Sequence, residues 1–155
     1  MPSRSGQPLL EAAMVFLIAF AMLSFFADGN GYEGDDLNSV IPMLHLPLAF
    51  QVPEDIYKYD WQPLAYWTGH AAYRLTGTIA AIFTLSQIGI AAGIALLWLV
   101  MTRGVGVSGW MFVPIVMMFP EIIYTGLYYN ATALGFPFAV LAVLLAFAGP
   151  GWGWA

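Results

Sequence analysis

The chain has 155 residues, of which 61% are hydrophobic and 8% are charged, and its net charge at pH 7 is −5. A soluble domain is usually about half apolar and about a quarter charged, so this chain has too few polar residues to cover a water-exposed surface. The composition predicts an integral membrane protein. The negative charge argues against nucleic acid as a partner, and the absence of cysteine excludes disulfides and thiolate metal sites.

Four segments are long and apolar enough to cross a bilayer as helices, which takes about 20 residues. They are residues 9–27, 78–102, 109–129 and 131–148. Backbone groups in lipid must bond within their own segment, so each segment is expected to be helical. The alternative for the first is a signal peptide, but its apolar run is long and no small-x-small cleavage pattern is clear, which favours a retained span.

The few basic residues predict the orientation of the spans. Arg4 precedes the first span and Arg103 follows the second, and the positive-inside bias places both on the inner side. Both termini are then inside, and residues 28–77 form an outer loop of about 50 residues. Lys58 and Arg74 fall on the outer side in this arrangement, against the bias.

The outer loop is too long for a structureless connection and is expected to carry two helices along the membrane surface. The first covers residues 35–50 and begins at the acidic pair Asp35 and Asp36, either of which can cap a helix. The second spans residues 62–77, with Pro63 in its first turn and Gly77 near its end. Its apolar residues at helical spacing are Leu64, Trp67, Ala71 and Leu75.

Seven of the nine acids lie between residues 28 and 60, and two of them, Asp35 and Asp36, are adjacent. Adjacent carboxylates can bind a divalent cation, or one can act as a general base while the other tunes its basicity. A solvated helix cap is the alternative interpretation. His45 and His70 are too far apart in the chain for a local metal motif, so no metal site is predicted from them.

Two further features lie within the predicted spans. Glu121 follows Pro120 in the third span, and an ionisable residue at membrane depth suggests a functional site. A role at the outer interface or in helix packing is the alternative for this side chain. The segment "GIAAG", residues 89–93, is a stripe of small residues that predicts close packing against another helix.

The order of these features resembles a known family. An acidic pair follows the first span, a "YDWQPLAYW" box precedes the second, and "FPEIIYTGLYYNATAL" joins the third to the fourth. This order resembles the N-terminal part of the GT-C class of membrane glycosyltransferases. The most similar branch is the group of dolichyl-phosphate-mannose protein mannosyltransferases and lipid A aminoarabinose transferases. The resemblance covers roughly residues 9–147 and rests on order and spacing.

The resemblance implies a reaction and its residues. Asp36, or its neighbour Asp35, would take the proton of an acceptor hydroxyl that attacks the anomeric carbon of a sugar. The donor would be a sugar on a polyprenyl phosphate or diphosphate, and the anomeric carbon would invert. Asp60 and the segment from Gln62 to Trp67 would line the donor side of the cleft.

Two more positions follow from the same resemblance. The aminoarabinose branch carries a lysine that meets the lipid phosphate, and Trp61 occupies that position here, so nearby Lys58 is expected to replace it. Glu121 belongs to the Pro-Glu…Tyr…Asn pattern of the third span and is expected to contact substrate. The acidic pair Asp35 and Asp36 could also hold a divalent cation as a cofactor.

The resemblance also implies partners and a location. These are a lipid-linked sugar donor, membrane lipids and other membrane subunits, in the inner membrane of a bacterial cell envelope. The family has many more spans than four, so the chain is expected to be an N-terminal module. The alternative is a non-catalytic membrane subunit that scaffolds a larger complex. A transporter or channel ranks last, because Glu11 and Glu121 are the only acids in the spans.

Overall fold

A computed structural model describes residues 7–27, 63–104, 112, 116, 118–127 and 131–147, and all regular structure within these residues is helical. In chain order the helices are α1 (Gln7–Ala27), α3 (Pro63–Thr76), α4 (Ala80–Gly104), α6 (Pro120–Leu127) and α7 (Ala131–Phe147). The predicted all-α class is confirmed for this part of the chain. The loop helix predicted over residues 35–50 lies outside the described residues.

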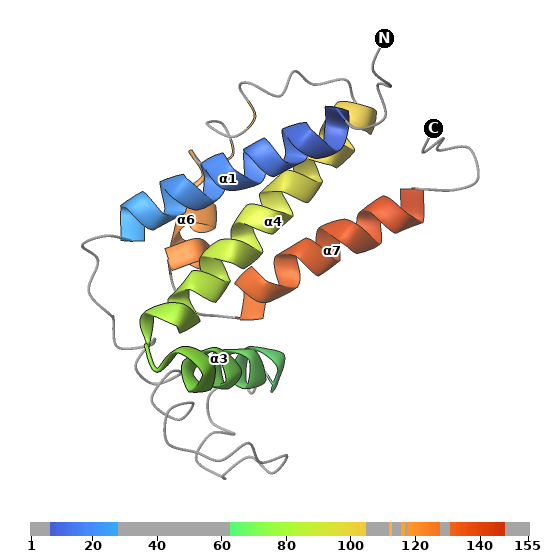
Figure 1. The fold of residues 1–155 in the computed structure, drawn as a ribbon. Coiled ribbons are helices and arrows are strands. Elements are labelled where there is room, and N and C mark those ends of the chain that lie inside the picture. Colours follow the sequence, from blue (N-terminus) through green and yellow to red (C-terminus); the bar gives the residue numbers. More distant parts are fainter. Residues whose placement is uncertain are drawn as a thin grey trace.

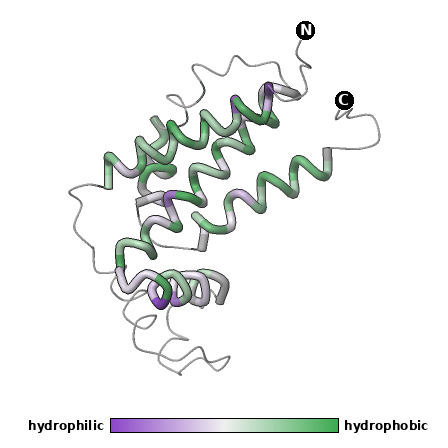
Figure 2. Tube along the Cα trace, in the orientation of Figure 1, coloured by the Kyte–Doolittle hydropathy of each residue, from purple (hydrophilic) through white to green (hydrophobic). Residues whose placement is uncertain are grey.

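Two of the described helices, α1 and α4, are long and apolar enough to cross a membrane. They have 21 and 25 residues, which gives lengths of about 31 and 37 Å at 1.5 Å per residue. The hydrocarbon core of a bilayer is about 30 Å thick. Helix α7 is apolar but shorter, with 17 residues. Figure 2 shows that apolar residues dominate α1 and α4, whereas α3 has a paler, more polar trace.

Helix α4 lies at the centre of the bundle and packs against α1, α3, α6 and α7. Figure 1 shows α1 antiparallel to α4, and α7 running in the same direction as α4. The end of α1 and the starts of α4 and α7 therefore lie together, and α3 crosses this end of the bundle (Figure 1). The first and last described residues lie at the opposite end, which is the relative arrangement that the predicted topology requires.

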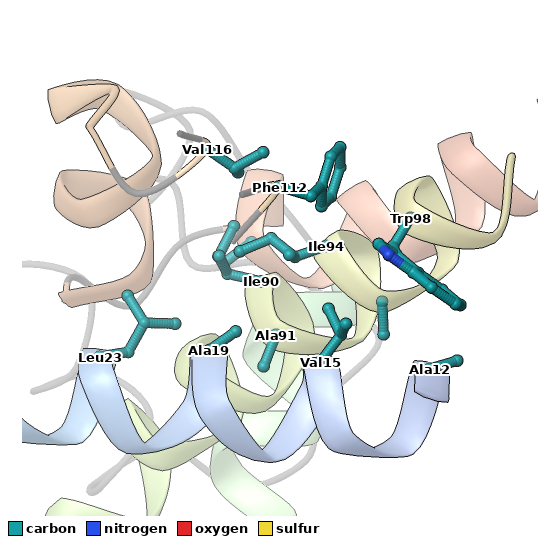
Figure 3. Close-up of a cluster of buried hydrophobic side chains, with 12 residues drawn as sticks. Ala12, Val15, Ala19, Leu23, Ile90, Ala91, Ile94, Trp98, Phe112 and Val116 are labelled. Carbon is teal, nitrogen blue, oxygen red and sulfur yellow. The ribbon is translucent and has the colours of Figure 1, made fainter. Parts of the chain in front are cut away.

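The main core lies between α1 and α4 (Figure 3). Helix α1 contributes one stripe of buried side chains, Ala12, Val15, Ala19 and Leu23. Helix α4 contributes Ile90, Ala91, Ile94 and Trp98, and Phe112 and Val116 cover the cluster from the other side. The alanines keep the stripe on α1 shallow, so the two helices can pack closely, as small residues allow in membrane bundles.

The small-residue stripe of α4 packs against α7, as predicted. A Cβ atom added to Gly89 would overlap the carbonyl oxygen of Ala133, and one added to Gly93 would overlap the ring of Phe136. At Gly89 the obstacle is backbone, which cannot rotate away. The approach of α4 to α7 therefore depends on glycine at this position.

The third predicted span differs from the structure. Residues 109–129 were expected to form one helix, but α6 has only eight residues and begins at Pro120. Met118 and Phe119, directly before it, are not helical. Proline lacks an N–H group and disfavours helical geometry in the residue before it, yet it is well suited to the first position of a helix. The helix here begins at Pro120, and the predicted continuity of the span through this point is wrong.

Candidate functional site

The predicted site residues fall mostly outside the part of the chain that the structure describes. This is so for Asp35, Asp36, Lys58, Asp60 and Gln62, and also for His45. Two predicted residues lie on described helices. Trp67 is on α3, and Glu121 is in the first turn of α6, where the backbone but not the side chain is described. Whether these residues share one site therefore stays a prediction.

Helix α3 carries the second half of the predicted donor-binding box and is fixed to the bundle by a second, smaller core. Ala65 is 3% exposed and packs with Ile82 and Phe83 near the start of α4. Leu134 of α7 packs against the same cluster. These contacts hold α3 across the end of the bundle, where the chain from residue 28 onward leaves α1.

The ends of α3 match the predicted signals. The helix begins at Pro63, whose missing N–H is not needed in the first turn. It is followed by Gly77, which has a φ of +72° and donates its N–H to the carbonyl oxygen of Tyr73 at 2.7 Å. This left-handed glycine closes the last turn and lets the chain turn into α4.

The buried face of α3 does not follow all of its apolar residues at helical spacing. Leu75 is 86% exposed, and Ala71 is also exposed. Ala65 takes the central contact instead, because a small side chain lets α3 approach α4 closely. Trp67 is half-buried and packs against this second core, so its ring has a structural role besides the predicted contact with donor.

Glu121 lies in the first turn of α6, and the contacts of this helix show what surrounds it. A Cβ atom on Gly126, near the end of α6, would lie 2.7 Å from a methyl carbon of Leu23. Glu121 is five residues earlier, about 7 Å along the α6 axis. Ile122 and Ile123, the next two residues, pack against the main core. The backbone of Glu121 therefore directly precedes residues that pack on the main core, and both of its predicted roles stay predictions.

The structure contains buried polar groups that the acidic motifs of the sequence do not indicate. The hydroxyl of Ser24 on α1 donates to Oε1 of Gln87 on α4 at 3.1 Å. Ser86, next to Gln87, is fully buried, and its hydroxyl has no hydrogen-bond partner among the described residues. Ser24, Ser86 and Gln87 are visible in the sequence as polar residues within apolar segments. The hydrogen bond between Ser24 and Gln87 holds α1 against α4 near the α3 end of the bundle.

His70 of α3 is only 6% exposed and is therefore buried in the packing of this helix. No group of three or more histidine, cysteine or acidic side chains that could hold a metal ion occurs among the described residues. The acidic pair proposed for a divalent cation lies outside these residues.

The chain was compared with protein-family models, curated proteins and solved structures, and none of the three comparisons finds a match.

Proposed function

We propose that this chain is an integral membrane protein in which α1, α4 and α7 lie across the bilayer. The supporting observation is the apolar outer surface of the bundle. On α1, Leu10 is 64% exposed and Phe25 is 77% exposed; on α7, Phe138 and Leu145 are 63% and 65% exposed. A soluble monomer rarely exposes so broad an apolar surface. In a bilayer, lipid tails would cover this apolar surface without a cost in free energy.

Two other classes of protein have similar helices. The core helix of a soluble protein is mostly buried, whereas only 22% of the apolar window of α1 and 50% of that of α4 are buried here. A signal peptide is removed from the mature chain. Helix α1 instead forms one side of the main core, with Ala19 and Leu23 fully buried, and its removal would leave the facing side of α4 bare.

The orientation of the bundle can be tested with single cysteines, because the chain has none of its own. Thr76 and Gln7 are exposed and lie at opposite ends of the bundle. In intact cells stripped of any outer barrier, a membrane-impermeant maleimide should label Thr76→Cys, and Gln7→Cys only after permeabilisation. Labelling in the reverse order would overturn the orientation, and equal labelling of both in intact cells would overturn membrane insertion.

On this scaffold we propose that the chain forms the donor-side module of a GT-C-type glycosyltransferase. The observation that carries the proposal is the position of α3. The helix that continues the predicted donor-binding box lies across one end of an apolar bundle, at the level where a lipid headgroup would sit. Asp60 and Gln62 directly precede this helix in the chain. A lipid-linked sugar could then keep its tail beside the spans and its sugar at the surface.

The proposed chemistry is an inverting displacement. The hydroxyl oxygen of the acceptor forms a new bond to the anomeric carbon, and the bond from that carbon to the phosphate oxygen breaks. The carboxylate of Asp36 takes the hydroxyl proton, with Asp35 beside it as the second candidate. The polyprenyl phosphate or diphosphate leaves with the bonding electrons. Lys58 is the proposed partner of its negative charge.

The test uses the full-length protein in liposomes with a sugar-loaded polyprenyl phosphate and a soluble acceptor. Asp35→Asn combined with Asp36→Asn should abolish transfer while the amount of membrane-inserted protein is unchanged. Glu11→Gln is the matched control, since Glu11 lies at the other end of the bundle and, among the described residues, accepts a hydrogen bond from Gln7. Transfer that persists in the double variant would overturn the assigned base, and no transfer by the unmodified protein would overturn the transferase proposal.

A second candidate function is a non-catalytic subunit that holds a larger membrane complex together. The observation that favours it is that only 22% of the apolar window of α1 is buried against the rest of the described structure. If the protein purifies in mild detergent as a stoichiometric complex with a larger membrane protein and transfers no sugar, the scaffold function is supported. Transfer by the isolated chain would rule it out.

A further inference from the structure

We draw no further inference here: the strongest candidate, the outward face of α7 where Gly135, Ala139, Ala142 and Ala146 recur at helical spacing, is a stripe of small residues within an apolar surface, and nothing in the structure shows what covers it.

Discussion

Replacing Gly89 with alanine is expected to separate α4 from α7. The added Cβ atom would overlap the carbonyl oxygen of Ala133, lie 3.0 Å from its carbonyl carbon and lie 3.4 Å from Cα of Leu134. All three are backbone atoms, so no side-chain rotation can relieve the contact and one helix must move. Overpacking of this kind destabilises a protein by about 1–3 kcal/mol.

Alanine is also a better helix former than glycine by about 1 kcal/mol, and this gain must be separated from the clash. Gly135→Ala is the matched control, because nothing lies within 4 Å of a Cβ atom added there. The control receives the gain in helix propensity without the clash. The difference in unfolding free energy between the two variants therefore reports the α4–α7 contact.

The assay is thermal unfolding of the purified protein in detergent, followed by far-UV circular dichroism. For a chain of this size about 1 kcal/mol corresponds to a change in Tm of about 2–4 °C. Gly89→Ala should therefore unfold between about 2 and 12 °C below Gly135→Ala. Equal melting temperatures, or a higher one for Gly89→Ala, would refute the backbone contact between these helices.

Two further outcomes follow from local geometry. Gly77→Ala should destabilise the protein by about 1–2 kcal/mol, because the left-handed φ of +72° is unfavourable for a side chain; Gly77→Asn should lose less in the same melting assay, and equal loss would argue against a backbone cause. A double-mutant cycle with Ser24→Ala and Gln87→Leu should give a coupling energy of about 0.6 kcal/mol, the average for such bonds in membrane bundles. A coupling of zero would mean that the hydrogen bond does not contribute.

The helical spans were the part of the fold most accessible from the sequence. Continuous apolar segments of sufficient length predicted residues 9–27, 78–102 and 131–148, and α1, α4 and α7 begin and end within a few residues of these bounds. The reason is that composition alone decides whether a segment suits lipid. The prediction of one continuous helix over residues 109–129 was wrong, because the hydropathy of a segment does not depend on the missing N–H group of Pro120.

The face of α3 that packs on the bundle could not be predicted from apolar spacing. If α3 lies at a membrane surface, as proposed, its apolar side chains can contact either lipid or protein, and the sequence pattern does not distinguish these two environments. Leu75 accordingly points away from the bundle, while Ala65 makes the contact. The hydrogen bond between Ser24 and Gln87 was missed for a related reason: it depends on the rotation of two helices about their axes, which neither segment specifies alone.

The α3 end of the bundle is where the two proposed functions make different demands. A scaffold needs α3 only as a stable element, and the cluster around Ala65 with the closing turn at Gly77 meets that need. A transferase also needs the acidic pair near the donor-binding box. Helix α1 ends and α3 lies at this same end of the bundle, so residues 28–62 leave and rejoin the described structure there. The seven acids of the loop belong to this connecting segment of the chain. Under the transferase proposal this end of the bundle would lie at the membrane surface, where a charged base and a lipid-linked sugar would meet. For that reason loss of transfer on neutralising Asp35 and Asp36 separates the two functions more directly than any change in stability.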